Sequence, residues 1–134
     1  MFILIIYYSI IKMPNNKYDI EYIDCEGYTN LMRCAESSNK IVGLKDAIIL
    51  LDNGADINYT MDDSEYPQNG VSALILAVHY NNKELVELLL AKGANTSHKV
   101  ATDIEENGKY ITIFETAKMR AIRLNHQSII PLFL

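Results

Sequence analysis

The sequence has little cysteine and no cluster of basic residues. Only two cysteines occur among its 134 residues, Cys25 and Cys34, so it carries neither a disulfide framework nor a Cys-x-x-Cys metal pair. Acidic residues outnumber basic ones by 17 to 12, which gives a formal net charge of −5. Because nucleic-acid backbones are bound by clustered Lys and Arg, we expect no nucleic-acid partner, and an anionic membrane surface is disfavoured for the same reason.

The motifs typical of enzymes and metal sites are also missing. None of the three histidines, His79, His98 and His126, belongs to an HExxH, HxH or nucleophile-elbow motif. No glycine-rich phosphate loop occurs, and the acidic runs at 62–65 and 103–106 lack the spacing of a calcium-binding loop. We therefore predict no catalytic residues, no metal site and no cofactor, and we interpret the acidic runs as solvated loop tips.

Only one long apolar run occurs, at residues 2–11. Ten residues are too few to span a membrane, which takes about 20, and no basic residue precedes the run as in a secretory signal. Three interpretations stay open: a leader before a start at Met13, a segment packed over an open end of the domain, or a signal or anchor. We assign residues 1–13 as an apolar segment of uncertain role, assign 14–134 as the folded domain, and do not expect membrane association.

What the sequence does contain is an internal repeat. Three segments share a hydroxyl residue, a large apolar residue two positions on and a small residue three positions after that; they begin at Thr29, Ser72 and Thr112. The hydroxyl residue suits a helix N-cap, the large residue anchors the helix in the core, and the small residue allows close helix contact. Each segment therefore predicts a short helix.

A second apolar segment follows the first in each copy. Residues 46–51 and 84–90 read as buried helices, and each is followed by a glycine, Gly54 or Gly93, that suits a left-handed C-cap. The first copy has four more residues than the second between its small residue and its glycine. We therefore predict a longer turn between the two helices of the first copy, around residues 37–44.

This pattern resembles the ankyrin repeat. Residues 27–31 and 70–74 match its Gly-x-Thr-Pro-Leu opening, residues 85–90 match its second helix, and residues 54–58 match its Gly-Ala-Asp-x-Asn end. The resemblance covers roughly residues 24–134. It implies an all-α solenoid of helix–turn–helix units joined by hairpin loops, with about three divergent repeats. The repeats are placed at approximately 24–58, 67–97 and 107–134.

The sequence departs from the family pattern in two ways. The three hydroxyl residues are 43 and 40 residues apart instead of about 33, which predicts long inter-repeat insertions in the hairpin loops. The third copy has Tyr110 in place of the opening glycine, and its second helix would be residues 129–134, with Ser128 as N-cap and Pro131 in the first turn. That bare apolar end suggests end-to-end self-association or an incomplete cap.

The resemblance implies a protein–protein interaction module that binds another protein through hairpin fingers and a concave helical face. We predict Tyr28 and Tyr80 as anchors, because tyrosine brings a large contact area at a small entropic cost. The other predicted contacts lie beside the opening of each repeat or at the outer end of its first helix. They are Glu26, Glu36, Gln68, Asn69, Val71, His79, Met119 and Arg120.

The sequence also suggests where such a module would work. The lack of a disulfide framework favours a reducing compartment, the cytoplasm. The usage of Ile, Asn, Tyr and Lys suits an A/T-rich genome, such as that of a large DNA virus, in which case the place is the host cytoplasm, or a protist. The alternatives are a part of a larger ankyrin array or a membrane-tethered adaptor, and an enzyme is the class least expected.

Overall fold

The computed structural model describes residues 16–62 and 64–134. The apolar run at 2–11, with its three interpretations, lies outside the described residues. The chain divides into two compact units, one ending at Asp56 and the other spanning Ile57–Leu134. No helix in the described ranges is long and apolar enough to cross a membrane.

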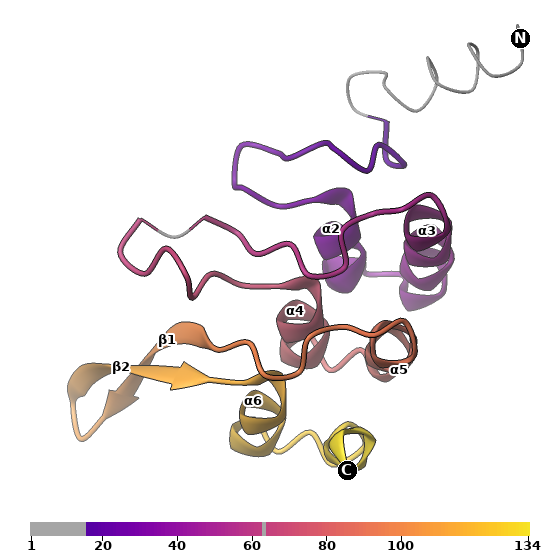
Figure 1. Ribbon diagram of the computed structural model, residues 1–134. Helices are drawn as coiled ribbons and strands as arrows, with labels where there is room; N and C mark the ends of the chain where they lie inside the picture. Colours follow the sequence, from indigo (N-terminus) through magenta and orange to yellow (C-terminus); the bar gives the residue numbers. More distant parts are fainter. Residues whose placement is uncertain (1–15, 63) are drawn as a thin grey trace, which may run out of the picture. The chain divides into compact units, whose positions relative to one another are not determined.

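The first unit contains one helical pair (Figure 1). Helix α2 (Asn30–Glu36) packs against helix α3 (Lys40–Asp52). The side chain of Asn39 caps α3 by accepting the N–H groups of two residues in its first turn. A hairpin finger precedes α2, and its stem is closed by a bridge between Ile23 and Thr29.

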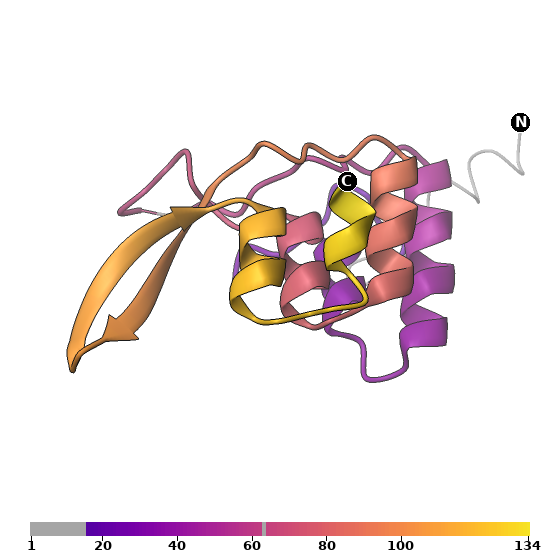
Figure 2. The same ribbon diagram turned by 90° about the horizontal axis from the view of Figure 1, so that it is seen from below.

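The second unit contains two further helical pairs. Helix α4 (Ala73–His79) packs against both α5 (Lys83–Ala91) and α6 (Ala117–Arg123), and α6 packs against the short 3₁₀ helix η1 (Ile130–Phe133), as Figure 2 shows. Their facing side chains form an aliphatic core with almost no exposed surface. This core consists of Leu74, Ile75, Val78, Leu85, Val86, Leu89 and Ile129.

The expectation of an all-α fold is wrong, because the finger before α6 is a β-hairpin. Strands β1 (Val100–Glu106) and β2 (Lys109–Glu115) pair antiparallel and extend away from the helices (Figure 2). Asn107 and Gly108 form the two-residue turn with φ of 53° and 74°, the conformation in which an Asn-Gly turn matches the twist of its strands. β2 is rich in β-branched and aromatic residues, which favour a strand over a flexible loop.

The predicted start of the third repeat is four residues too early. Thr112 lies in the middle of β2, and the N-cap of α6 is Thr116, whose hydroxyl accepts the N–H of Met119 at 3.3 Å. The repeat pattern requires a large apolar residue two positions after the hydroxyl residue. Phe114 meets this requirement for Thr112, whereas the exposed Lys118 stands two positions after Thr116. The small residue of this helix is therefore the fully buried Ala121.

The predicted long turn in the first repeat is also wrong. α3 and α5 begin at the same distance from the N-caps of their first helices, so the turns before them are equally long. The extra residues lie in the helix itself, since α3 has 13 residues and α5 has 9. One additional helical turn extends the second helix without changing the connection that precedes it.

The ends of the second helices follow the prediction in two repeats. Gly54 and Gly93 have φ of 89° and 86°, which confirms the left-handed conformation expected after α3 and α5. In the third repeat η1 has Pro131 in its first turn, as predicted. Its N-cap position is Ile129, which makes no side-chain cap bond, so the prediction of Ser128 is wrong.

Gly70 provides a test of how tightly the second finger is closed. A Cβ atom at this position would lie 1.7 Å from the carbonyl oxygen of Met61, a backbone atom that cannot move aside alone. We expect Gly70→Ala to lower the free energy of unfolding by about 1–3 kcal/mol, as overpacking typically does, measured by urea denaturation.

The matched control is Gly93→Asn. Nothing lies within 4 Å of its Cβ, and asparagine tolerates the left-handed conformation that Gly93 adopts. A loss in Gly70→Ala no larger than that in Gly93→Asn would show that the finger backbone relaxes around the new methyl group.

Candidate functional site

The first helices of the three repeats begin in the same way. The hydroxyl oxygens of Thr29, Ser72 and Thr116 accept the N–H group of the residue three positions on, at 3.2, 3.3 and 3.3 Å. Each of these residues also ends a finger, whose returning strand leads directly into the helix. Positions counted from the three N-caps are therefore equivalent, and the residues that occupy them can be compared.

One equivalent pair of positions lies at the end of each finger and in the first helix that follows it. It consists of the residue before the N-cap and the residue four positions after the N-cap. In the first repeat these are Tyr28 and Arg33, with the guanidinium carbon 4.3 Å from the ring centroid. In the second they are Val71 and Leu76, both apolar and nearly fully buried. The same two positions therefore hold a cation–π pair in one repeat and an apolar pair in the next.

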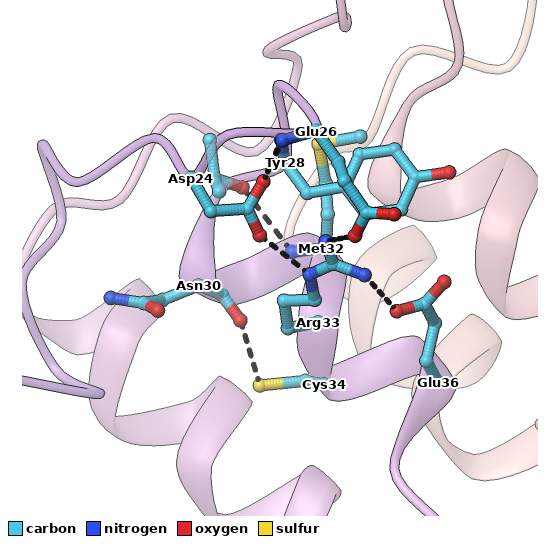
Figure 3. Close-up of polar contacts among 9 residues, drawn as sticks. Asp24, Glu26, Tyr28, Asn30, Met32, Arg33, Cys34 and Glu36 are labelled. Carbon is cyan, nitrogen blue, oxygen red and sulfur yellow. Dashed lines mark hydrogen bonds and ion pairs between the residues drawn. The ribbon is translucent and has the colours of Figure 1, made fainter. Parts of the chain in front are cut away.

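Arg33 is the centre of an ion-pair cluster in the first repeat (Figure 3). Its Nε donates to Asp24 Oδ2 at 2.7 Å, its Nη1 donates to Glu36 Oε2 at 2.6 Å, and its Nη2 donates to Glu26. The three carboxylates come from the finger and from the end of α2, while the ring of Tyr28 lies against the guanidinium. One positive charge among three negative ones leaves this surface acidic.

Asp24 connects the turn of the first finger to this cluster. Its Oδ1 accepts the N–H groups of Glu26 and Tyr28 at 2.9 and 3.0 Å, while its Oδ2 accepts from Arg33. The Arg33 hydrogen bond is the main cause that lowers the pKa of Asp24, with the two backbone bonds adding to it. The finger is thus fixed on α2 by a charged side chain that stays ionised.

The third repeat holds a buried ion pair in place of the cation–π pair. Glu115, which is 1 % exposed, accepts from Arg120 Nε at 2.7 Å and from Arg123 Nε and Nη2 at 2.9 and 2.7 Å. Arg120 Nη2 also donates to Thr102 Oγ1 at 2.5 Å, which links α6 to β1. Burial raises the pKa of Glu115, but the hydrogen bonds from Arg123 and Arg120 outweigh it and lower that pKa to about 2.

The end of α4 exposes two aromatic rings. His79 and Tyr80 are both exposed, and their rings meet edge to face with centroids 5.1 Å apart. Partial burial lowers the pKa of His79, and the nearby charges of Arg120 and Arg123 lower it further. A neutral imidazole beside a tyrosine offers both apolar area and hydrogen-bonding groups to a binding partner.

The ten predicted contact residues fall into three groups by exposure. Five are exposed, namely Glu26, Gln68, His79, Tyr80 and Met119. Three are half-buried, namely Tyr28, Glu36 and Asn69. Two are buried, namely Val71 and Arg120.

The two buried residues cannot serve as the predicted contacts. Val71 is 8 % exposed, because the residue before the N-cap closes the finger onto the helix. Arg120 is also 8 % exposed, and its guanidinium is engaged by Glu115 and Thr102. The prediction of Arg120 rests on Thr112 as the N-cap; with Thr116 as the N-cap, the residue equivalent to Tyr80 is Leu124.

The structure gives two other predicted contacts, Met119 and Asn69, positions or roles that differ from the prediction. Met119 is equivalent to His79 only if Thr112 is the N-cap; with Thr116 as the N-cap, Arg123 occupies the position equivalent to His79. Asn69 connects the second finger to the third, because its Nδ2 donates to the carbonyl of Lys99 at 2.8 Å. Met119 is therefore exposed at a different position of its helix, and Asn69 holds two fingers together.

The sequence patterns missed the arginines. Arg33, Arg120 and Arg123 organise the two ion-pair clusters, yet only Arg120 is among the predicted contacts. The sequence feature that could have identified the buried ion pair is an acidic residue before the N-cap, Glu115, with a basic residue five positions later, Arg120. That spacing is not one of the usual helix pairings, since the first residue lies outside the helix.

Cys34 is a core thiol. It is 7 % exposed, and its Sγ donates to the carbonyl of Asn30 at 3.3 Å. Burial raises the pKa of the Cys34 thiol to about 12, with the charge of Asp46 adding to the effect, which disfavours the reactive thiolate. Within residues 16–62 and 64–134, no group of three or more His, Cys, Asp or Glu side chains is placed to hold a metal ion.

Comparison with known families agrees with this architecture. The family model described as ankyrin repeats, in three copies, matches residues 46–134. No curated protein matches the chain significantly. The matched segment includes most of α3 and all the described helices and strands that follow it.

The buried carboxylate predicts a defined pH dependence. The pKa of Glu115 is about 2 in the folded chain and 4.5 in an unperturbed glutamate, so its ion pairs stabilise the fold fully above pH 4.5. One pKa unit corresponds to about 1.4 kcal/mol, so we expect Glu115→Gln to cost roughly 3 kcal/mol at pH 7. The loss should shrink as the pH falls from 4.5 to 2, measured by denaturation at each pH.

Glu105→Gln, at an exposed position on β1, is the control and should change stability little at any of these pH values. A Glu115→Gln loss that stays constant from pH 7 to pH 2 would contradict an ionised, paired Glu115.

Proposed function

Because the chain belongs to the ankyrin-repeat family, whose repeats are generally protein–protein interaction modules, we propose that it binds a partner protein through its fingers and the ends of its first helices. The observation that carries this proposal is the exposure pattern of α4. All six residues from Ala73 to Val78 are buried, while His79 and the C-cap residue Tyr80 are exposed. The helix thus offers a partner only its final residues.

Neighbouring charges support a contact at this place. Arg123 occupies on α6 the position that His79 occupies on α4, and α4 packs against α6. The Arg123 side chain is 32 % exposed although it is bound to Glu115. Tyrosine and arginine, here Tyr80 and Arg123, are among the side-chain types that contribute most to protein interfaces.

The first unit offers a second contact region of different character. Tyr28 is held by Arg33, and Glu26, with a side chain that is 67 % exposed, projects from the finger. A rigid tyrosine loses little conformational freedom on binding. The excess of carboxylates around Arg33 favours a partner segment that is basic or neutral rather than acidic.

We propose the cytoplasm as the place of action. Both Cys25, which is exposed, and Cys34, which is buried, are free thiols. A reducing compartment keeps an exposed thiol such as Cys25 from forming intermolecular disulfides.

The proposal is tested by affinity capture with the double variant His79→Ala/Tyr80→Ala. We expect the wild type to retain a specific host-cell protein, identified by mass spectrometry, and the variant to retain at least about tenfold less of it, because truncating interface aromatics commonly costs more than 1.4 kcal/mol. Circular dichroism must show equal helix content in both proteins.

The matched control is Lys83→Ala/Glu87→Ala, which removes an exposed ion pair of 3.7 Å from α5 in the same unit. Such surface pairs contribute little stability, so this variant should fold and capture like the wild type. Equal loss of capture in both double variants would contradict a contact at the end of α4, and the absence of any retained protein would contradict the binding function.

A further inference from the structure

The two edges of the β1–β2 hairpin differ in charge: β1 carries acidic residues, whereas the centre of β2 is uncharged. β1 carries three acidic residues, Asp103, Glu105 and Glu106, and charges on an edge strand discourage pairing with another strand. The five residues Tyr110–Phe114 at the centre of β2 include neither a charge nor a proline. In the described part of the chain the sheet has only these two strands, so the outer edge of β2 has no strand beside it.

The hydrogen-bond pattern fixes which backbone groups point outward from β2. The N–H of Ala101 leaves the hairpin and donates to the carbonyl of Asn69 at 3.0 Å, so Ala101 and its opposite residue Phe114 form a non-hydrogen-bonded pair. Such pairs alternate with hydrogen-bonded ones along an antiparallel ladder. The N–H and C=O groups of Tyr110, Thr112 and Phe114 therefore face the outer edge of β2.

The centre of β2 reads the same in both directions. Its sequence is aromatic, Ile, Thr, Ile, aromatic, with Thr112 in the middle. Antiparallel pairing of two copies about Thr112 places Tyr110 opposite Phe114, Ile111 opposite Ile113, and threonine opposite threonine. Aromatic, β-branched and Thr–Thr pairs are those that stabilise neighbouring strands. The outward N–H and C=O groups of Thr112 would make the central Thr112–Thr112 pair a hydrogen-bonded one.

The side chains that such pairing would cover are partly exposed, although the Phe114 ring also meets Tyr66 edge to face with centroids 5.4 Å apart. Tyr110 is 79 % exposed, Phe114 is 42 % exposed and Ile111 is 39 % exposed. Tyr110 and Phe114 lie on the same face of the hairpin as Thr112, two residues to either side. In a paired dimer these exposed rings would cover one another.

We propose that two copies of this chain associate through β2, which pairs antiparallel with β2 of the second copy about a two-fold axis at Thr112. The result is a four-stranded sheet in a closed dimer, since a two-fold interface uses the same surface on both copies. This association goes beyond the proposed partner binding and uses a different surface from the end of α4. It is also distinct from the end-to-end contact suggested by the apolar C-terminal residues.

The test compares Thr112→Pro with Asp103→Pro by analytical ultracentrifugation of the full chain. Both residues lie opposite each other in the ladder with outward N–H groups, so either proline spares the β1–β2 hydrogen bonds, and both remove the Thr112–Asp103 side-chain bond of 2.7 Å. We expect a dimer in the wild type and in Asp103→Pro, and a dissociation constant raised at least about tenfold in Thr112→Pro.

A cross-link provides an independent measurement that does not weaken the strand. In a Cys25→Ser background, Thr112→Cys should form an intermolecular disulfide under mild oxidation, because directly opposite residues in a hydrogen-bonded antiparallel pair have Cα atoms about 5.5 Å apart. Asp103→Cys, on the far strand, should cross-link much more slowly. A monomeric wild type, equal dissociation of the two proline variants, or equal cross-linking of the two cysteine variants would overturn the proposal.

Discussion

The hydrogen bond that the third amide N–H of each first helix donates to the hydroxyl oxygen of the N-cap is the interaction on which the rest of this structure depends. It fixes the residue at which each finger ends and each first helix begins. Once that residue is fixed, the helical period decides which side chains enter the core and which emerge at the far end. The exposed rings of His79 and Tyr80 and the buried methyl of Ala121 are consequences of this one register.

Much of the helical architecture could be predicted because its signals are local. A hydroxyl N-cap and a C-cap glycine act on backbone groups within one turn, so Thr29, Ser72, Gly54 and Gly93 are visible in the sequence alone. The predicted N-cap of the third repeat is wrong because two hydroxyl residues four positions apart, Thr112 and Thr116, both suit an N-cap. Phe114 favoured the wrong one, since its side chain serves a strand and not a helix.

The β-hairpin and the charged clusters depend on information that spacing alone does not carry. The Asn107-Gly108 turn is a recognisable hairpin signal, but a template that expects only helices and loops passes over it. From the sequence alone, Arg33 is typical of an arginine on the solvent-exposed face of a helix. Its role emerges only when the finger folds back and brings Asp24 and Glu26 to the same side chain.

The equivalent pair of positions at the end of the finger and in the first helix has a consequence for how the repeats diverge in evolution. The apolar pair Val71 and Leu76 and the ionic pair Glu115 and Arg120 solve the same packing problem. A single substitution cannot convert one into the other without leaving an unpaired buried charge, which is costly. Each repeat is therefore expected to keep its own type of residue pair, because a change at only one of the two positions destabilises the fold. Compensating changes at these two positions should occur together among relatives.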